Sequence, residues 1–383
     1  MQSVYFDRIQ HFNENARIMN DNNFVKLGDV AHECRLTWSG EQTNIPIVGL
    51  EHLIPGEIEL SSWDSNIEHT FSKKFTKGQV LLGRRRVYLK KAVVAPCDGI
   101  CSGDITVIES TGGILPELLP FVIQNDRFFD YAMQGSAGSL SPRVKWEHLK
   151  NYEFSLPSLA EQKVLADKLW AAYHLKESYK KLLAATEEMV KSQFIEMFTD
   201  KGYPLTMIKS FADVSTGGTP SKAHPEYWNG DKPWVSAEDM KSKYVYDTCE
   251  KVTEAGYAAC KIIPVDTLMY VCRGSIGVMA INKIECATNQ SICRATCHNN
   301  VCNVEFLYHA LMYQRDNIKK KGTGTSFKSL NQTTFSELEI ELPPYDEQMK
   351  FVTIAEQSDK SGFELRKSVD AIDKVIKSVI NEN

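Results

Sequence analysis

An internal repeat of about 186 residues constrains the architecture of this chain more than any single motif does. A repeat at a nearly fixed offset means that one structural unit is built twice. Corresponding positions follow the same order in both copies: Asp29 with Asp213, residues 46–48 with 233–235, Gly138 with Gly324, residues 154–157 with 340–343, and Gln162 with Gln348. The 383-residue chain is therefore interpreted as two copies of a globular part followed by a helix.

Each copy ends in a segment with the spacing of a coiled-coil seam, in which apolar residues alternate steps of four and three. The seam positions are Leu165, Leu169, Ala172, Lys176, Tyr179, Leu183, Thr186, Val190 and Phe194 in the first copy, and Phe351, Ala355, Ser358, Gly362, Leu365, Val369, Ile372, Ile376 and Ile380 in the second. Lys176 and Thr186 interrupt the first seam, and Ser358 and Gly362 weaken the start of the second. Ser158 and Glu161 have the spacing of a capping box at the first helix start. Because a lone helix of this length is not stable by itself, the two segments are predicted to pair; ordinary core packing is the alternative.

Short β-rich runs alternate with glycine-rich turns in the globular parts, which predicts an α+β fold with a curled sheet and few helices. Strands are predicted at residues 106–108 and 261–264, and helices near residues 117–133 and 303–321. The predicted organisation is an N-terminal segment of open role at 1–23, a first globular domain at 24–157, a spacer helix at 158–200, a second globular domain at 201–343 and a C-terminal spacer helix at 344–383.

The composition is that of an ordinary globular protein, with 43% hydrophobic and 24% charged residues. The first twenty residues do not resemble a signal peptide, and no window approaches the roughly 18 apolar residues of a membrane span. We therefore expect a cytoplasmic protein with no membrane association. Its ten cysteines are then expected to be reduced, and the spacing of Cys293, Cys297 and Cys302 beside His298 fits no paired zinc motif, so no metal is predicted.

The net charge of −5 is unevenly divided. Residues 24–150 sum to −1 and residues 201–340 to +2, which leaves −6 mainly on the helices, linkers and N-terminus. Basic clusters in the globular parts are candidates for contacts with nucleic-acid phosphates, with a solvated basic surface as the alternative. The candidates are Arg84, Arg85, Arg86, Lys90 and Lys91 in the first part, and Lys319, Lys320, Lys321, Thr325 and Lys328 in the second.

Two segments of the sequence resemble catalytic motifs without matching them. Residues 322–329 resemble a phosphate-binding loop, yet Phe327 stands where that loop needs a glycine before its lysine. Residues 342–345 resemble the motif of amino-group DNA methyltransferases, but Leu342 cannot accept a hydrogen bond from the target amine. No cluster of acidic residues suited to nuclease chemistry is recognised, so no catalytic residue is predicted.

The second copy contains a series of glycine-rich and aromatic segments in a fixed order. They are Gly217-Gly218-Thr219-Pro220-Ser221, Tyr227-Trp228-Asn229-Gly230, Pro233-Trp234-Val235, Arg273-Gly274-Ser275-Ile276-Gly277, Ala287-Thr288-Asn289-Gln290, and Leu342-Pro343-Pro344 with Glu347-Gln348. This series resembles the specificity subunit of type I restriction–modification systems, and the resemblance extends from about Phe24 to the C-terminus. The first copy is more divergent, since it lacks both glycine runs and keeps Leu156-Pro157 and Glu161-Gln162.

The resemblance implies a non-catalytic subunit with two pseudo-symmetric α/β target-recognition domains separated by two long antiparallel coiled-coil helices. Each domain is expected to read one half of a bipartite site in double-stranded DNA. The helices are expected to set the spacing and dock two methyltransferase subunits, which a restriction–translocase subunit joins. S-adenosylmethionine and ATP are then expected on those partners only, so no cofactor is predicted for this chain.

Four residues in turn-rich segments of the resembling region are further candidates for DNA contacts: Arg273, Ser275, Asn289 and Gln290. Their structural alternative is stabilisation of tight turns and loops. Two other functional classes stay open, a self-contained adenine methyltransferase–nuclease with a similar recognition region and a two-repeat scaffold without a role in DNA. Binding of S-adenosylmethionine by the isolated chain favours the first, and the absence of a split DNA consensus favours the second.

Overall fold

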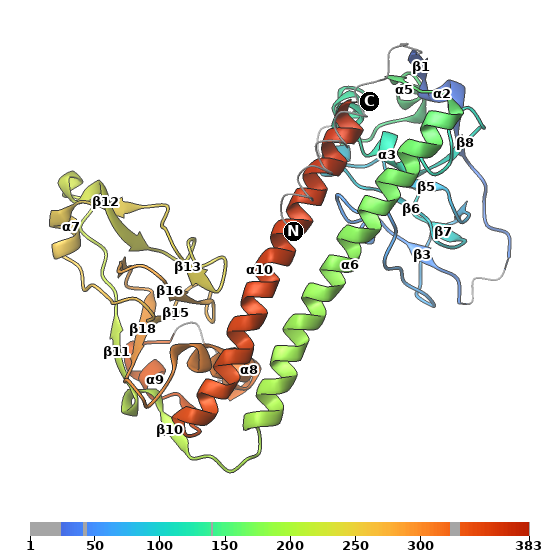
Figure 1. Cartoon of the computed structure of the whole chain (residues 1–383). Helices are drawn as coiled ribbons and strands as arrows, with labels where there is room; N and C mark the ends of the chain where they lie inside the picture. Colours follow the sequence, from blue (N-terminus) through green and yellow to red (C-terminus); the bar gives the residue numbers. More distant parts are fainter. Residues whose placement is uncertain (1–23, 41–43, 139–140, 322–329, 383) are drawn as a thin grey trace. The chain divides into compact units, whose positions relative to one another are not determined.

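The computed structural model describes residues 24–40, 44–138, 141–321 and 330–382, with the side chains of the helix at 304–321 described as far as Tyr313 (Figure 1). The chain forms two compact units: unit 1 comprises Met1–Lys181 and Leu365–Asn383, and unit 2 comprises Leu182–Glu364. Each unit therefore holds one globular part and a portion of each long helix, α6 (Leu159–Phe198) and α10 (Tyr345–Glu382). Residues 1–23, whose role the sequence left open, lie outside the described residues.

Unit 1 contains, besides its portions of α6 and α10, the elements β1 (Phe24–Lys26), α2 (Leu27–Val30), β2 (Ala31–Cys34), β3 (Ile47–Val48), β4 (Lys73–Phe75), β5 (Val80–Gly83), η1 (Val87–Leu89), β6 (Ala92–Val94), β7 (Gly99–Cys101), β8 (Ile105–Ser110), α3 (Leu119–Ile123), α4 (Asp126–Gln134), α5 (Trp146–Leu149) and β9 (Glu153–Ser155). Its main sheet is antiparallel, in the order β2-β8-β5-β6. A smaller sheet has the order β3-β7-β4, and β1 pairs with β9.

Unit 2 contains, besides its portions of α6 and α10, the elements β10 (Leu205–Met207), η2 (Ile208–Ser210), β11 (Ala212–Thr216), η3 (Pro225–Tyr227), β12 (Trp228–Val235), β13 (Tyr244–Val245), β14 (Lys251–Val252), α7 (Glu254–Ala258), β15 (Leu268–Val271), β16 (Met279–Asn282), β17 (Ala287–Thr288), β18 (Ile292–Cys297), α8 (Val304–Lys321), α9 (Gln332–Ser336) and β19 (Glu339–Glu341). Its main sheet has the order β11-β18-β15-β16-β13. A smaller sheet has the order β14-β12-β17, and β10 pairs with β19.

The two units repeat one sheet topology, which accounts for the repeat in the sequence. The order β2-β8-β5-β6 of unit 1 corresponds to β11-β18-β15-β16 of unit 2. In the smaller sheets, β3 pairs in parallel with β7 as β12 pairs in parallel with β17. These strands carry the matched segments 46–48 and 233–235. The predicted fold class, an α+β chain with two related α/β domains and two long helices, is confirmed.

The repeated glutamines attach each long helix to its globular part through equivalent hydrogen bonds. Gln162 Oε1 accepts from the Leu115 N–H at 2.8 Å, and Gln348 Oε1 accepts from the Asn303 N–H at 2.9 Å. Each Nε2 donates to two backbone carbonyls: Pro157 at 2.9 Å and Gly113 at 3.3 Å for Gln162, and Pro343 at 2.8 Å and Val301 at 3.0 Å for Gln348. Both side chains are buried, so these bonds satisfy amides that water cannot reach.

The helices α6 and α10 pack antiparallel within each unit. In unit 1, Leu169 and Tyr173 share a core with Ile376 and Ile380, near the C-terminal end of α10. In unit 2, the later residues Phe194 and Phe198 of α6 pack on Phe351 near the start of α10, with ring centroids 5.2 and 5.7 Å apart. Within the described residues, no helix is both long and apolar enough to span a membrane.

The predicted start of the first long helix is confirmed. Glu161 N–H donates to Ser158 Oγ at 3.5 Å, while Ser158 N–H donates to Glu161 Oε2 at 3.0 Å. This is the reciprocal bonding of a capping box, and it satisfies two donors that the first helical turn leaves free.

Two local predictions from the sequence are wrong. Residues 261–264 contribute a single bridge, Ile263 with Cys286, rather than a strand, and Pro264 lacks the N–H that would extend a ladder. The helix predicted near residues 117–133 is divided into α3 and α4. Asn125 has extended backbone between them and caps α4 by accepting from the Arg127 N–H at 2.8 Å.

Candidate nucleic-acid interface

One edge of the main sheet of unit 2 gathers the turns that carry the family-like segments. Strand β11 ends at Thr216 and β15 ends at Val271, and both pair antiparallel with β18, which begins at Ile292. Because neighbouring antiparallel strands alternate in direction, the turns after β11 and β15 and the turn before β18 meet at one edge of the sheet. These turns are residues 217–221, 272–278 and 288–291 (Figure 1).

Backbone hydrogen bonds join these turns directly. The Gly218 N–H donates to Thr288 O at 2.8 Å, and the Cys272 N–H donates to Ser291 O at 2.8 Å. Leu330 adds a third connection, since its N–H donates to Cys272 O at 2.8 Å. The turns therefore form one interlinked surface, which we call the loop edge of unit 2: residues 217–221, 272–278 and 288–291.

Glycine is required at specific points of this loop edge. A Cβ at Gly217 would lie 2.1 Å from the backbone oxygen of Thr288, which is far inside van der Waals contact. Gly274 and Gly277 have φ values of +78° and +86°, in the left-handed region that other residues rarely adopt. Gly217 allows the two backbones to approach closely, and Gly274 and Gly277 allow the tight turns. A turn-forming role of this kind is the alternative that the sequence offered for residues 273–277.

A buried arginine lies behind the loop edge, and no motif in the sequence marks it. Arg294 in β18 is 1% exposed. Its Nη1 donates to Lys261 O at 2.6 Å, and its Nη2 donates to Ser215 Oγ at 2.9 Å and Thr216 O at 2.7 Å. Burial lowers the pKa of this guanidinium. The bonds to Ser215 and Thr216 hold the end of β11 in place. Because the described partners are all neutral oxygens, they leave the positive charge of Arg294 in place beneath the turns. Its signal in the sequence is a charged residue within a mostly apolar strand.

The four candidates at the loop edge fall into two groups. Arg273 and Ser275 are exposed, and no described residue pairs with the Arg273 side chain. Asn289 Oδ1 accepts from the Ser291 N–H at 2.9 Å, and Gln290 Oε1 accepts from the Thr219 hydroxyl. The hydrogen bonds of Asn289 and Gln290 stabilise the loop, whereas the exposed side chains of Arg273 and Ser275 can reach a ligand.

The basic loop of unit 1 occupies the place that corresponds to the 272–278 turn. Residues 84–91 connect β5 to β6, as residues 272–278 connect β15 to β16. The correspondence extends to the backbone. The Val144 N–H donates to Arg84 O at 3.0 Å, and the Leu330 N–H donates to Cys272 O at 2.8 Å. The arginines at 84–86 in unit 1 and Arg273 in unit 2 therefore lie in equivalent loops of the repeated topology.

Acidic partners neutralise part of the basic loop of unit 1. Arg85 Nη1 lies 3.4 Å from Asp104 Oδ2, and Lys90 pairs with Asp126. Lys91 Nζ donates to a backbone carbonyl, that of Leu50, at 2.7 Å. Arg84 is half-buried, whereas Arg86 is exposed and has no partner among the described side chains.

Asp104 binds a second arginine of unit 1 in addition to Arg85. Arg143 Nε lies 2.7 Å from Asp104 Oδ1, and this hydrogen bond is the main cause that lowers the pKa of the Asp104 carboxyl. Asp104 is therefore ionised at neutral pH and joins the 84–91 loop to the segment that contains Arg143.

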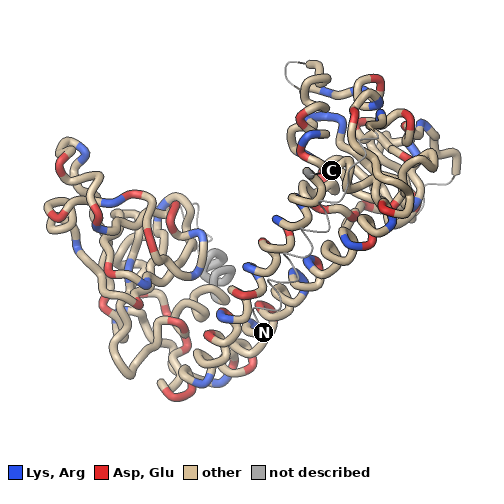
Figure 2. The backbone as a smooth tube through the Cα atoms, turned by 45° about the horizontal axis from the view of Figure 1, so that its top comes forward, with Lys and Arg blue, Asp and Glu red and all other residues tan. Residues whose placement is uncertain are grey.

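The second basic cluster of the sequence lies at the end of α8. The backbone of Lys319, Lys320 and Lys321 is helical, and their side chains are outside the described part of the structure. Thr325 and Lys328 lie outside the described residues altogether. The 186-residue offset places Lys319 on Met133 rather than on the 84–91 loop, so the two clusters occupy different points of the repeat. Lys and Arg are interspersed with Asp and Glu along the described backbone of both units (Figure 2).

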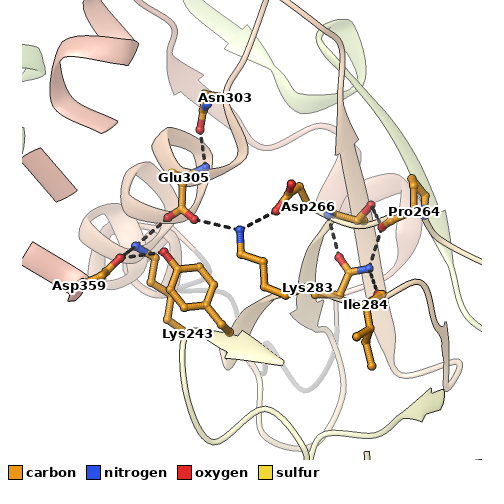
Figure 3. A network of polar contacts seen from close by, with 11 residues as sticks. Lys243, Pro264, Asp266, Lys283, Ile284, Asn303, Glu305 and Asp359 are labelled. Carbon is orange, nitrogen blue, oxygen red and sulfur yellow. Dashed lines mark hydrogen bonds and ion pairs between the residues drawn. The ribbon is translucent and has the colours of Figure 1, made fainter. Parts of the chain in front are cut away.

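A partly buried ion-pair network fixes the sheet of unit 2 to α8 and α10 (Figure 3). Lys243 Nζ lies 2.6 Å from Asp359 Oδ2 on α10 and 2.7 Å from Glu305 Oε2 on α8. Lys283 lies on the other side of Glu305, at 3.8 Å. Lys243 also donates to His309 Nε2 at 3.2 Å, and burial, together with this cation, lowers the pKa of His309 to about 3.

The predicted seam residues lie in the following places. Leu169, Val190, Phe351 and Ile376 are buried, and Leu165, Tyr179, Leu183, Leu365, Val369 and Ile372 are half-buried. Tyr173 and Ala166 are buried as well, although the four-and-three spacing omits them.

Comparison with known proteins identifies the second copy. Residues 202–371 match the family described as the type I restriction modification DNA specificity domain. The specificity subunit of the type I restriction enzyme MjaIX from Methanocaldococcus jannaschii is 29% identical over 182 residues, which cover 46% of this chain and 42% of that protein. The EcoR124I/EcoR124II specificity subunit from Escherichia coli is 32% identical over 152 residues, 37% of each chain. The chain thus matches about two fifths of the length of these relatives.

The fold comparison extends over nearly the whole chain. The crystal structure of a type I restriction-modification S subunit from M. genitalium superposes with a TM-score of 0.65 at 13% identity, covering 96% of this chain and 97% of that one. Residues 202–371 are therefore similar to type I restriction modification DNA specificity domains, and the chain has the fold of the S subunit from M. genitalium.

Proposed function

We propose that this chain is the DNA-recognition subunit of a type I restriction–modification complex. Each unit reads one half of a bipartite site in double-stranded DNA, and the paired helices set the distance between the half-sites. The observation that carries this proposal is the equivalence of two exposed turns, residues 84–91 in unit 1 and residues 272–278 in unit 2, at corresponding edges of corresponding sheets. Two related reading surfaces on one chain suit a site with two halves.

The chemistry of these turns fits contact with DNA. Arg86 and Arg273 are exposed and lack described partners, so either guanidinium is free to approach a phosphate or a guanine edge. The buried charge of Arg294 stabilises an anion near the turns of unit 2. Phosphate contacts remain a prediction for the other basic candidates, which include Lys319, Lys320, Lys321 and Lys328.

We propose that methyltransferase subunits dock on the long helices, because α6 exposes a second apolar stripe outside its seam. Leu182 and Met189, both in unit 2, are 52 and 46% exposed, and they lie seven residues apart. Such spacing places them on one face of the helix. A stripe of this kind facing water is typical of a surface that a partner covers.

Catalysis is assigned to the partners rather than to this chain. Methyl transfer and DNA cleavage or translocation then take place on methyltransferase and restriction subunits, which bind S-adenosylmethionine and ATP. We place the complex in the cytoplasm, where it meets both host and incoming DNA.

The main test is the adenine methylation pattern of a host with and without this chain, co-expressed with its methyltransferase subunit. The expected result is a chain-dependent consensus of two half-sites separated by a fixed gap. A chimera that exchanges residues 202–343 for those of a relative should change one half-site and keep the other. A contiguous consensus, or none that depends on the chain, contradicts the proposal. Binding of S-adenosylmethionine by the chain alone would instead support the self-contained methyltransferase.

The phosphate contacts are tested through the salt dependence of DNA affinity in the assembled complex. Each lost contact lowers the slope of log affinity against log salt by about 0.9, so Arg273→Ala should lower it by about one and the Lys319, Lys320 and Lys321 triple alanine variant by up to about three. Lys209→Ala is the control, because Lys209 pairs with Glu337 and precedes β11, at the end of that strand opposite the loop edge. Equal slopes for Arg273→Ala and the unchanged chain remove Arg273 from the interface.

Docking is tested with a pair of variants on adjacent faces of α6. Leu182→Glu places a charge in the exposed stripe and should abolish co-purification with the methyltransferase subunit while leaving the melting temperature unchanged. Ala184→Glu introduces the same side chain at an exposed position outside the stripe and should co-purify normally. Normal assembly of Leu182→Glu excludes the stripe as the docking surface.

A further inference from the structure

Three side chains of metal-ligand type meet on one face of the β2–β8 pair in unit 1. His32 stands directly opposite Glu109 in the antiparallel ladder, and Cys34 stands opposite Val107. Side chains alternate between the two faces of a strand, so His32 and Cys34 share a face two residues apart. Glu109 completes the group from the neighbouring strand, 75 residues after Cys34 in the chain.

The separations of their ligand atoms are those that one small ion requires. His32 Nε2 lies 3.6 Å from Cys34 Sγ, and Cys34 Sγ lies 3.2 Å from Glu109 Oε2. All three ligand atoms lie within 4.8 Å of one another. A tetrahedral zinc ion, with bonds of about 2.3 Å to sulfur and about 2.0 Å to nitrogen or oxygen, holds such atoms about 3.5 Å apart. Only small side-chain shifts are needed for all three atoms to bind one ion.

A buried glutamine supports two of the three groups. Gln79 is 5% exposed, and its Nε2 donates to Glu109 Oε2 at 2.9 Å and to Cys34 Sγ at 3.3 Å. A hydrogen-bond donor of this kind orients a ligating carboxylate and stabilises a thiolate. Gln79 comes from the start of β5, so the arrangement is braced by the core of the sheet rather than by surface side chains alone.

The charges also suit a divalent cation. A thiolate and a carboxylate offset the two positive charges, and a neutral imidazole adds none. Lys73, whose charge acts on the Cys34 thiol, is itself paired with Glu33 at 3.2 Å and with the carbonyl of Ile105 at 2.9 Å. Burial and the Glu109 hydrogen bond raise the pKa of the Cys34 thiol to about 12, so the ion displaces a proton when it binds.

We infer that unit 1 binds a zinc ion through His32 Nε2, Cys34 Sγ and a carboxylate oxygen of Glu109, with the fourth position open to water. The site lies on a different strand pair from the 84–91 loop and is independent of the proposed DNA contacts. No zinc-motif spacing marks these three residues in the sequence; the ladder register brings them together.

A second trio, Glu51, His52 and Asp64, is less suited to a metal and provides a control. The Gly49 N–H donates to His52 Nδ1 at 2.9 Å. The neutral ring therefore carries its hydrogen on Nε2, which lies 3.4 Å from Asp64 Oδ2. That nitrogen serves as a donor to a carboxylate, whereas a metal needs its lone pair.

The test is zinc and cobalt titration of the full chain after treatment with a chelator. We expect one tightly bound zinc per chain and, with cobalt, a thiolate-to-metal charge-transfer band. Cys34→Ser should remove the band, and His32→Ala should weaken zinc binding at least tenfold. Gln79→Leu should weaken it by about 10- to 100-fold, as expected for loss of a supporting hydrogen bond. Zinc should also raise the melting temperature of the unchanged chain but not that of Cys34→Ser.

Cys97→Ser and His52→Ala are the matched controls, since each removes a potential ligand of unit 1 outside the trio, and both should bind zinc normally. Circular dichroism of each metal-free variant establishes that it is folded; His32 is exposed, so His32→Ala in particular should keep its fold. The inference is overturned if the folded chain binds no stoichiometric zinc. It is also overturned if zinc binding survives His32→Ala and Cys34→Ser, or is lost in His52→Ala.

Discussion

Lys176 Nζ lies 3.0 Å from Asp373 Oδ1, so a buried lysine in the seam of α6 pairs with an aspartate on α10. The sequence shows Lys176 only as an interruption of the apolar seam. In the structure its side chain is 5% exposed and lies over the ring of Tyr173, with Nζ 5.2 Å from the ring centroid. A buried polar pair among apolar neighbours fixes the register of two helices, at some cost in stability.

Removing either partner of this pair should have opposite effects. Asp373→Ala leaves Lys176 buried without its counter-charge and should lower the free energy of unfolding by about 1 to 3 kcal/mol, less than for a fully buried pair because Asp373 is 40% exposed. Lys176→Met should be neutral or stabilising. Urea denaturation measures both, with Lys163→Ala as the control, since its pair with Asp167 is exposed and should contribute little.

The two repeated glutamines should be equally important to their units. Gln162→Ala or Gln348→Ala leaves one backbone N–H and two carbonyls without their side-chain partner, which should cost about 2 to 4 kcal/mol of stability. Gln193→Ala on α6 removes an amide that, among the described residues, donates only to the side chain of Glu196, so it should cost less than about 0.5 kcal/mol. Thermal unfolding of the three variants checks this, and a loss in Gln193→Ala as large as that in Gln162→Ala would contradict the anchoring role.

His309 should make unit 2 sensitive to acid. Its pKa is about 3 in the folded chain and about 6.5 when unfolded, so the unfolded state binds more protons between those values. Stability is therefore full above pH 6.5 and falls as the pH is lowered, by up to about 1.4 kcal/mol per pH unit.

His309→Gln keeps a neutral acceptor for Lys243 and should flatten this dependence between pH 6.5 and pH 4, measured by urea denaturation at each pH. His224→Gln, at an exposed histidine, should leave the dependence as it is. Parallel pH profiles for the unchanged chain and His309→Gln would exclude His309 as the cause.

Adjacent glycines of the loop edge should respond differently to the same substitution. Gly217→Ala forces a methyl group to 2.1 Å from Thr288 O and should separate the 217–221 and 288–291 turns, with a loss of DNA affinity and of stability. At Gly218 an added Cβ meets no atom within 4 Å, so Gly218→Ala should be tolerated in stability. Equal melting temperatures of the two variants would show that the turns rearrange freely.

Local patterns in the sequence were sufficient for the parts of the fold that depend on periodicity. The repeat predicted two related units, and the four-and-three spacing predicted α6 and α10, because a helix places residues of that spacing on one face. The capping box at Ser158 was predictable for the same reason, since its partners lie within one turn. The split between α3 and α4 was missed, because an asparagine cap inside an apolar stretch changes no periodicity.

The candidate site depended on contacts that no local pattern reports. Arg85 and Lys90 show no partners in the sequence, while Asp104 and Asp126, which pair with them, come from a turn and a helix further along the chain. The contacts of Arg294, the contacts within the loop edge, and the group of His32, Cys34 and Glu109 likewise join residues that are far apart in the sequence. The sequence by itself determined which elements form and that they form twice. The tertiary structure decided which side chains meet, because strand register joins residues that sequence distance separates.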